Sequence, residues 1–250
     1  RKAGLEKDTL LMVSSDHGPG HYSGPERKAI ANQMKKMEEQ GHFSRGPWRG
    51  YKFSGYEGGL RVPFAAVWPG VVRPGSENDS LIGLNDLMAT WADIAGIKLG
   101  RSQAPDSISF LPYLKNQEII VRNHLVARGT RADVYYEGNW KLILGPGSGS
   151  SGPFFTEPRS EEAWKAALRK FGRNPKNHKE LENPTFVQLY DLKDDPGETK
   201  NLAKTHFGQV EKMINDYKKI VEDGRSTAGP KLTNDRPLRI FRPPGFVWKK

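Results

Sequence analysis

The stretch from Asp8 to Pro69 decides the fold. An apolar run, Thr9-Leu10-Leu11-Met12-Val13, leads into the polar turn Ser14-Ser15-Asp16-His17-Gly18-Pro19, and a second polar segment follows about thirty residues later, Arg49-Gly50-Tyr51-Lys52-Phe53-Ser54-Gly55-Tyr56-Glu57-Gly58-Gly59-Leu60-Arg61-Val62-Pro63. The apolar run predicts a strand, Thr9–Ser14, buried on both faces of an α/β sheet. Ligands of such sheets bind beyond the carboxyl ends of strands, which is where Asp16 and His17 fall. We therefore predict that this turn and the loop carrying Lys52 form half of an active site.

Composition and charge narrow the class of protein. The 250 residues, of which 36% are hydrophobic and 27% charged, fit a globular protein of one large or two smaller domains. No apolar run approaches the roughly 20 residues of a membrane span. The sequence has no cysteine, which excludes disulfides, thiolate metal sites and a cysteine nucleophile within these residues.

The net charge of +10 is unevenly distributed. Residues 226–250 hold six basic residues and one acid, and so supply half of it. A basic surface favours anionic partners such as nucleic acid, anionic lipid, or a sulfated or phosphorylated substrate. The alternative is a solubilising, partly disordered tail. We favour no nucleic-acid partner, because these basic residues lie in a Pro-rich segment with no recognisable docking fold.

Further elements follow from hydrophobic periodicity and turn residues. In the first half we predict a helix, a strand, a second helix that ends at Gly96, and a helical turn, at Pro25–Glu39, Val62–Trp68, Leu81–Ile97 and Ser107–Leu114. In the second half we predict four strands and two helices, at His124–Arg128, Ala132–Tyr136, Trp140–Leu144, Gln188–Leu192, Glu161–Phe171 and Val210–Val221, with a hairpin turn at Glu137-Gly138-Asn139.

These elements predict two portions and a tail. Residues 1–120 form an α/β portion, residues 121–225 a small antiparallel sheet with a helix packed on it, and residues 226–250 a basic Pro-rich tail. The first portion has only two clear strands, fewer than a doubly wound sheet needs. It therefore looks like part of a larger domain.

The chemistry of the two loops is that of an anion and a hard cation. Asp16 is an oxygen ligand suited to Ca²⁺ or Mg²⁺. His17 is a poorer ligand for such an ion, but it can donate a hydrogen bond to an anion or bind zinc. Lys52 offers a point charge for an anionic oxygen. Taken singly, each of these residues also fits an ordinary turn, cap or solvated loop.

In order, the motifs resemble those of the formylglycine-dependent sulfatases, of the alkaline phosphatase-like superfamily, over their C-terminal half. The matching residues are Ser15-Asp16-His17-Gly18-Pro19, Arg49-x-x-Lys52-x-x-x-x-Glu57-Gly58-Gly59-x-Arg61-Val62-Pro63, Trp68-Pro69-Gly70, Asp86-Leu87-Met88-x-Thr90, Asp106-x-x-Ser109, Trp140-Lys141-Leu142-Ile143, and Leu189-Tyr190-Asp191-Leu192-x-x-Asp195-Pro196-x-Glu198-x-x-Asn201-Leu202. The resemblance covers residues 5–222. It implies a mixed sheet flanked by helices, followed by a small C-terminal sheet-and-helix module.

The resemblance also implies roles for three residues. Asp16 would bind the active-site calcium, with Mg²⁺ the less favoured metal. His17 stands where many members have Asn and some, such as those resembling iduronate sulfatases, have His, and it would bind the metal or the sulfate oxygens. Lys52 would contact the sulfate and stabilise charge on the leaving oxygen. Sulfatases of this kind are periplasmic, secreted or lysosomal, and a sulfated carbohydrate is the expected substrate.

The sequence departs from the family in two respects. The family's nucleophile is a Cys or Ser in Cys/Ser-x-Pro-x-Arg that is converted to formylglycine, and no Cys is present here. The upstream metal-binding aspartates are also missing. We therefore expect an N-terminal sulfatase segment, from the same precursor or a second chain, to supply the nucleophile.

Substrate choice and two rival functions remain open from the sequence. Residues between or near the two loops are candidates for the sugar pocket: His21, Tyr22, His42, Arg45, Trp48, Arg128 and Arg131. An arginine fork suits a second sulfate or a carboxylate, and an aromatic ring suits a sugar face. The same half-site can serve a phosphonate or phosphate monoester hydrolase of this superfamily. The chain can also be a non-catalytic anion-binding module.

Overall fold

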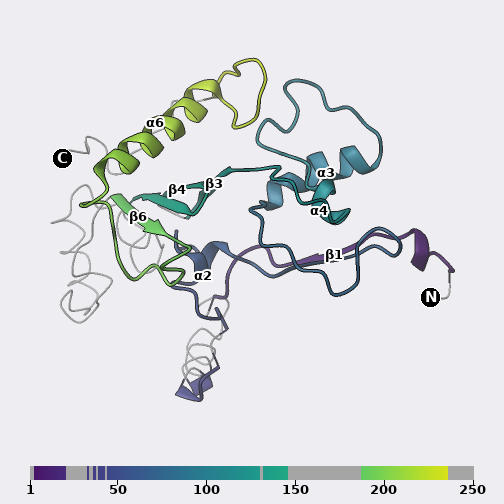
Figure 1. Ribbon diagram of the computed structural model, residues 1–250, viewed down its shortest axis with the longest axis horizontal. Coiled ribbons are helices and arrows are strands. Elements are labelled where there is room, and N and C mark those ends of the chain that lie inside the picture. Colours follow the sequence, from purple (N-terminus) through teal and green to yellow (C-terminus); the bar gives the residue numbers. More distant parts are fainter. Residues whose placement is uncertain are drawn as a thin grey trace.

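The structure is a computed structural model that describes residues 3–20, 33, 36–37, 39–42, 44–129, 132–145 and 187–235. Two sheets organise these residues. A two-stranded sheet extends to one side of a four-stranded sheet, and a long helix lies along the four-stranded one (Figure 1). The segment between the two sheets holds three short helices. No helix of the described part is long and apolar enough to cross a membrane.

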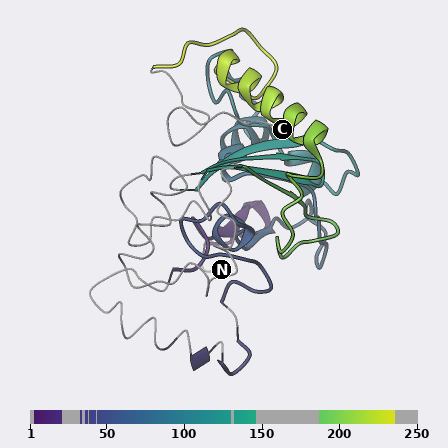
Figure 2. The same ribbon diagram turned by 90° about the vertical axis from the view of Figure 1, so that its left-hand side faces the viewer.

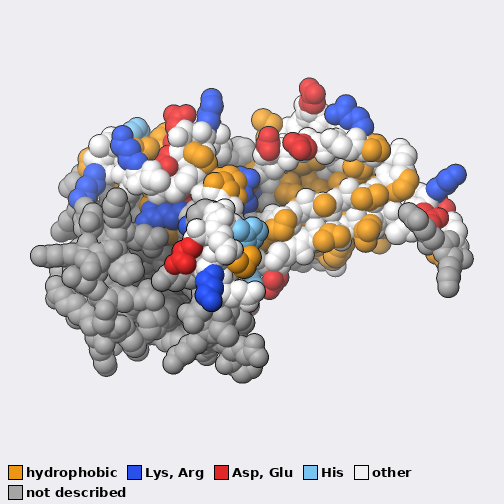
Figure 3. Space-filling model, turned by 90° about the horizontal axis from the view of Figure 1, so that it is seen from below, with side chains coloured by type: hydrophobic (Ala, Val, Ile, Leu, Met, Phe, Trp, Pro, Cys, Tyr) orange, Lys and Arg blue, Asp and Glu red, His pale blue; other side chains and the backbone are white. Residues whose placement is uncertain are grey.

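The two-stranded sheet joins the two ends of the stretch that decides the fold. After the 3₁₀ turn η1 (Glu6–Asp8), β1 (Leu11–Ser14) pairs antiparallel with β2 (Phe64–Val67). One face packs on a hydrophobic cluster that includes Phe110, Leu111 and Leu114. The other face leaves Leu11, Val13 and Val67 between 57% and 59% exposed, and Figure 3 shows the row of hydrophobic side chains along this arm.

The prediction that the first strand is buried on both faces is therefore wrong for the described part of the chain. Burial of both faces requires neighbouring elements on each side. Within the described ranges, β1 pairs with β2 alone, and one face of the pair stays uncovered.

The predicted helix Leu81–Ile97 forms in shorter pieces. It consists of the 3₁₀ turn η2 (Leu84–Asp86) and helix α3 (Leu87–Ile94). Its end is as predicted, because Gly96 takes a φ of +67° and Ile97 donates its backbone N–H to the carbonyl of Ala92. The helical turn predicted at Ser107–Leu114 is the four-residue α4 (Leu111–Leu114).

The buried face of α3 differs from the predicted apolar stripe. Met88 and Trp91 are 49% and 53% exposed, whereas Thr90 is fully buried. The Thr90 hydroxyl donates to the carbonyl of Asp86 and accepts the backbone N–H of Phe110. Asp86 is itself buried with Arg122, and its carboxylate accepts the N–H groups of Gly83 and Ile108. A hydrogen-bonded polar cluster thus sets the rotation of the helix.

The four-stranded sheet agrees closely with expectation. Strands β3 (His124–Arg128), β4 (Asp133–Glu137), β5 (Trp140–Leu144) and β6 (Val187–Asp191) lie side by side in chain order, all antiparallel. The predicted bounds hold for β3 and β5 and are displaced by one residue for β4 and β6. The predicted hairpin turn forms at Gly138, with a φ of +55°.

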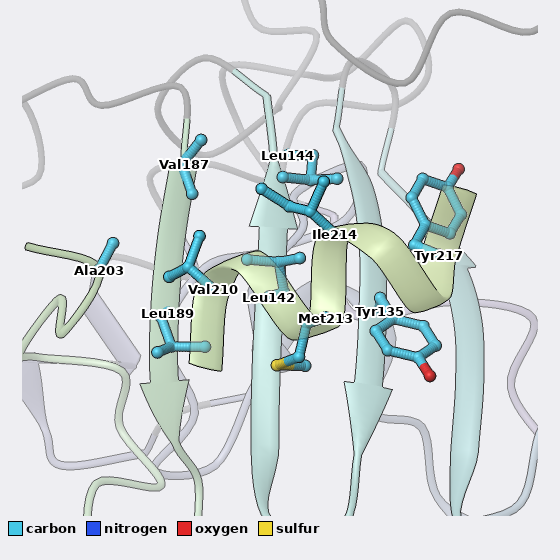
Figure 4. Packing of buried hydrophobic residues seen from close by; sticks show 10 residues of the cluster. All are labelled: Tyr135, Leu142, Leu144, Val187, Leu189, Ala203, Val210, Met213, Ile214 and Tyr217. Atoms are coloured by element: carbon cyan, nitrogen blue, oxygen red, sulfur yellow. The ribbon is translucent and has the colours of Figure 1, made fainter. Parts of the chain in front are cut away.

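Both faces of this sheet are covered. Helix α6 (Phe207–Asp223) lies across one face, where Tyr135, Leu142 and Leu189 meet Val210, Met213 and Tyr217 (Figure 4). Side chains that alternate with these point to the opposite face and pack against Tyr56, at the start of the one-turn helix α2 (Glu57–Leu60). Figure 2 shows α6 and α2 on opposite sides of the sheet. The sheet therefore fixes the position of α2.

Other predicted elements lie wholly or partly outside the described residues. Glu161–Phe171 falls in residues 146–186 and the tail beyond residue 235 is not described. Of Pro25–Glu39, the described residues Gln33, Lys36, Met37 and Glu39 are helical. The division at residues 120 and 225 stays a prediction.

Candidate active site

Backbone hydrogen bonds join the two polar loops singled out in the sequence. Gly18 donates its N–H to the carbonyl of Gly59 over 3.1 Å, and Lys52 donates to the carbonyl of Pro19 over 2.9 Å. The approach is so close that a Cβ on Gly18 would lie 1.9 Å from the carbonyl oxygen of Gly58. Only glycine fits there. The strand-end turn and the Lys52 loop therefore form one structural unit.

The side chains of Asp16 and His17 contact each other at the end of β1. Nε2 of His17 lies 2.9 Å from Oδ2 of Asp16, and Nδ1 lies 2.9 Å from the carbonyl oxygen of Gly18. The Asp16 side chain is 80% exposed and that of His17 34%. When the ring is neutral and Nδ1 holds the proton, the lone pair of Nε2 is available to a metal.

A depression of about 440 Å³ opens beside this pair. It is lined by Asp16, His17, Phe53, Ser54, Gly59, Leu60, Arg128 and Gly129. Lys52 lies next to it, with Nζ 5.0 Å from the centre of the Phe53 ring. The wall thus combines a carboxylate, an imidazole, a guanidinium and two apolar side chains, which suits an anionic ligand with an apolar face.

The structure brings some of the predicted substrate residues to this depression and not others. Arg128 lines it, with Nε 3.5 Å from Oδ1 of Asp133. The Arg45 guanidinium donates a hydrogen bond to the carbonyl of Trp48, and its Cζ lies 5.2 Å from the Tyr51 ring centre. Neither Arg45 nor Trp48 lines the depression. His42 is exposed and does not line the depression either, and the predictions for His21, Tyr22 and Arg131 fall outside the described residues.

The donor set fits part of a metal site. The exposed Asp16 carboxylate is the oxygen ligand that a hard cation prefers, and His17 stands beside it. Ca²⁺ takes six to eight oxygen ligands. No group of three or more His, Asp or Glu side chains arranged to hold a metal occurs within the described ranges. These residues can therefore supply only a fraction of the ligands of such an ion.

One buried cluster of charges was not predicted from the sequence. Nζ of Lys141 lies 2.8 Å from Oε1 of Glu57 and 2.7 Å from Oε1 of Glu198, and all three side chains are at most 6% exposed. The Tyr136 hydroxyl donates to Glu57 over 2.7 Å. The backbone N–H of Glu57 donates to Oε2 of Glu198 over 2.7 Å. The available signal was Lys141 itself, a lysine within an otherwise apolar predicted strand.

The pKa values of the two glutamates shift in opposite directions, although burial raises both. Burial by itself raises the pKa of Glu57, but the charge of Lys141 and hydrogen bonds from Lys141, Tyr136 and Arg61 outweigh it and hold the pKa below the ordinary value. For Glu198, burial prevails over the same lysine, and its pKa is raised. One lysine shared by two carboxylates fully stabilises only one of them.

This cluster fixes the loop that meets Asp16 and His17. Glu57 belongs to α2, Lys141 to β5, and Glu198 to the segment after β6. The Arg49 guanidinium donates a hydrogen bond to the carbonyl of Glu198 over 2.6 Å. Because Gly59 at the same helical turn accepts the N–H of Gly18, the cluster anchors the Asp16–His17 turn and the Lys52 loop to the four-stranded sheet.

The expected location of the nucleophile needs one correction. The expectation that it lies outside these residues rests on the missing Cys, but the Ser form of the family's motif has one match by letters, Ser23-Gly24-Pro25-Glu26-Arg27. These residues lie outside the described part. The sequence therefore does not by itself place the nucleophile in another segment.

Comparisons with known proteins agree with the motifs. The family model described as Sulfatase matches residues 1–97. The chain is 30% identical over 203 residues to an N-acetylgalactosamine-6-O-sulfatase of Bacteroides thetaiotaomicron, a match covering 81% of this chain and 34% of that one. It is 32% identical over 178 residues to a ulvan-active sulfatase of Formosa agariphila, covering 66% and 34%. The chain spans about a third of the length of these two relatives.

Solved structures give the same result for the fold. A sulfatase structure from work on glycosaminoglycan metabolism by Bacteroides thetaiotaomicron matches with a TM-score of 0.64 and 27% identity, over 88% of this chain and 40% of that one. A sulfatase from Pseudoalteromonas sp. matches with a TM-score of 0.57 and 18% identity, over 88% and 38%. These likenesses confirm the predicted alkaline phosphatase-like α/β fold. The chain belongs to the sulfatase family.

Proposed function

We propose that this chain is part of a sulfatase that hydrolyses sulfate esters of a carbohydrate. The observation that carries the proposal is the pair of backbone hydrogen bonds that hold the Asp16–His17 turn against the Lys52 loop, beside one depression. The names of the related N-acetylgalactosamine-6-O-sulfatase and ulvan-active sulfatase support a carbohydrate substrate. Such enzymes work in the periplasm, outside the cell or in the lysosome, and we propose the same for this one.

Each of the three residues has a defined task in this proposal. Asp16 and His17 contribute ligands to Ca²⁺, in preference to Mg²⁺, together with ligands from outside the described residues. The bound cation supplies positive charge to the sulfate oxygens. Lys52 holds a fixed positive charge at the oxygen between sulfur and sugar. Negative charge develops on that oxygen as the S–O bond breaks, and a preorganised cation stabilises it more in the transition state than in the ground state.

The nucleophile and the rest of the sheet complete the proposal. We propose that the nucleophile is a formylglycine on an N-terminal segment, and that this segment also covers the apolar face of β1 and β2. Support comes from the three large side chains on that face, Leu11, Val13 and Val67, each more than half exposed. Mass spectrometry of the natural protein tests both parts. A longer or second chain with formylglycine agrees with the proposal, whereas formylglycine at position 23 places the nucleophile within this chain.

Substitution of Lys52 tests the catalytic assignment. In the complete enzyme, Lys52→Ala should lower turnover by about 10²–10³-fold, the usual effect of removing one group that stabilises developing charge. Lys98→Ala, which removes an exposed lysine beyond α3, is the matched control and should leave turnover unchanged. A near-normal rate in the Lys52 variant would refute its role.

A substrate comparison separates the rival functions. The proposal predicts faster hydrolysis of sulfated sugars than of the corresponding phosphate esters and of phosphonate esters. The reverse order identifies a phosphate or phosphonate ester hydrolase of the same superfamily. A third outcome is that the natural protein contains no formylglycine and binds these anions without hydrolysing them. That outcome identifies a non-catalytic anion-binding module.

A further inference from the structure

Phe53 holds a backbone conformation that its side chain disfavours. Ser54 donates its N–H to the carbonyl of Tyr51 over 3.0 Å, which closes a tight turn with Phe53 at the third position. The φ of Phe53 is +74°. Turns with a positive φ at this position usually have Gly or Asn there. A bulky aromatic residue with such a φ is a genuine outlier.

Close packing of glycines keeps the turn in this conformation. A Cβ on Gly129 would lie 2.9 Å from the N of Gly55 and 3.1 Å from the carbonyl oxygen of Phe53. A Cβ on Gly59 would lie 2.5 Å from the carbonyl oxygen of Tyr51. The backbone of the turn is therefore confined by neighbouring backbone on two sides. Strain of this kind persists where the surroundings impose it, and it concentrates at ligand-binding sites.

The Phe53 side chain does not serve the hydrophobic core. It is 40% exposed, and it belongs to the lining of the depression with Leu60. Its ring centre lies 6.3 Å from that of His17 and 5.0 Å from Nζ of Lys52. An apolar ring thus lies near both of the groups assigned to the sulfate. A burial role would hide the ring, whereas a binding role requires this exposure.

We propose that Phe53 is a specificity-determining residue whose ring forms the apolar wall for the sugar of a sulfated carbohydrate. This inference rests on the proposed function. A pyranose has a C–H face that contacts an aromatic ring, and its polar edge carries the sulfate toward Lys52 and His17. Arg128, on the lining of the same depression, is placed to pair with a second anionic group of the sugar.

Three variants of the complete enzyme test this assignment. Phe53→Gly removes the ring and also the energetic cost of the positive φ. Phe53→Leu keeps an apolar side chain without the aromatic face. Phe53→Tyr is the conservative control. For each, calorimetry gives the affinity for N-acetylgalactosamine 6-sulfate and for inorganic sulfate. Steady-state kinetics on a sulfated sugar give KM and kcat separately, and a thermal scan gives the melting temperature.

The expected pattern has opposite signs for binding and stability. Phe53→Gly should weaken sugar binding and raise KM by about ten-fold, the fold-change that corresponds to about 1.4 kcal/mol. It should leave sulfate affinity and kcat near wild type, and its melting temperature should stay level or rise, because glycine tolerates a positive φ. Phe53→Leu should fall between, and Phe53→Tyr should match wild type.

Other results overturn the inference. Sugar affinity equal to wild type in Phe53→Gly shows that the ring contacts no sugar. A lowered melting temperature with equal losses for sugar and sulfate shows that Phe53 is a packing residue. A wild type that hydrolyses sulfate esters but does not bind the sulfated sugar refutes the inference alone, whereas one that hydrolyses no sulfate ester refutes the proposed function while the binding comparison still decides the role of Phe53.

Discussion

Replacement of Lys141 by Met should destabilise the protein severely at neutral pH. The substitution retains most of the side-chain volume and removes the charge shared by Glu57 and Glu198. Both carboxylates are nearly inaccessible, at 6% and 0% exposure of their side chains. Removal of one partner from a buried ion pair costs about 3–5 kcal/mol, because the remaining charge is buried without compensation. Both carboxylates lose the lysine, although Glu57 keeps its contacts with Arg61 and Tyr136. A loss within that range is therefore expected, a large share of the roughly 5–15 kcal/mol that stabilises a typical native protein.

The loss of stability in Lys141→Met should depend on pH and should be smaller at acidic pH than at neutral pH. In Lys141→Met we expect the pKa of both buried carboxyls to rise, because each loses the lowering effect of the Lys141 charge, and the pKa of Glu198 is already raised in the wild type. The folded state then binds more protons than the unfolded state, so the stability of the variant rises as pH falls toward 4.5. In the wild type the pKa of Glu57 is lowered, and its contribution is present above 4.5 and lost as pH falls through the folded value. The difference between wild type and variant should therefore narrow on acidification.

Urea denaturation of the purified protein at pH 7.5 and pH 5.0 measures this effect. The matched control is Lys212→Met, because Lys212 pairs with Glu137 and Asp216 but has a side chain 53% exposed. Exposed ion pairs contribute about 1 kcal/mol or less, so this control should change little. If Lys141→Met loses no more stability than the control, or if its deficit grows at pH 5.0, the cluster does not anchor the loops as described.

Three further substitutions test other parts of the structure. Asp133→Asn should raise the free energy of unfolding above pH 6 by up to about 3 kcal/mol, measured by urea denaturation, and should flatten its pH profile between about 4 and 6. Burial raises the pKa of Asp133 to about 6, so the folded carboxyl holds a proton below that pH, and the stability linked to this proton is lost as pH rises through that value. Gly18→Ala should lower turnover of the complete enzyme by about 100-fold, since its Cβ would separate the two loops, and unchanged kinetics would show that the loop contact is dispensable. Gly224→Ala should lower the melting temperature through a cost of about 1–2 kcal/mol, because residue 224 has a φ of +64° and a Cβ would lie 2.5 Å from the carbonyl oxygen of Leu232; a scan that matches wild type would contradict it.

Local patterns predicted the second sheet well. Strands β3 and β5 have the bounds expected from their apolar runs, and the Gly138 turn joins β4 to β5 as its sequence indicates. Each of these features depends on a few neighbouring residues, so the chain needs no distant partner to specify them. The same is true of the strand-end position of Asp16 and His17, which follows from the apolar run immediately before them.

Features that depend on distant partners were less predictable. The rotation of α3 follows from the Thr90 bonds to Asp86 and Phe110, which apolar periodicity cannot show. The Glu57–Lys141–Glu198 cluster joins segments that are 84 and 141 residues from Glu57 in the chain. No single window of sequence contains more than one of its members. The residues next to Glu57, among them Gly58 and Gly59, are typical of a turn and do not indicate that its carboxylate is buried.

The two backbone hydrogen bonds between the Gly18 turn and the Lys52 loop have a consequence for how proteins of this family can diversify. These hydrogen bonds use main-chain atoms on both sides of the intervening chain. They fix the relative position of its two ends without restricting its length. Loop-closure entropy grows only slowly, by about 0.6 kcal/mol for each doubling of length. Insertions between residues 21 and 48 should therefore cost little free energy of folding. New sugar contacts can be gained there while Asp16 and Lys52 keep their relative position.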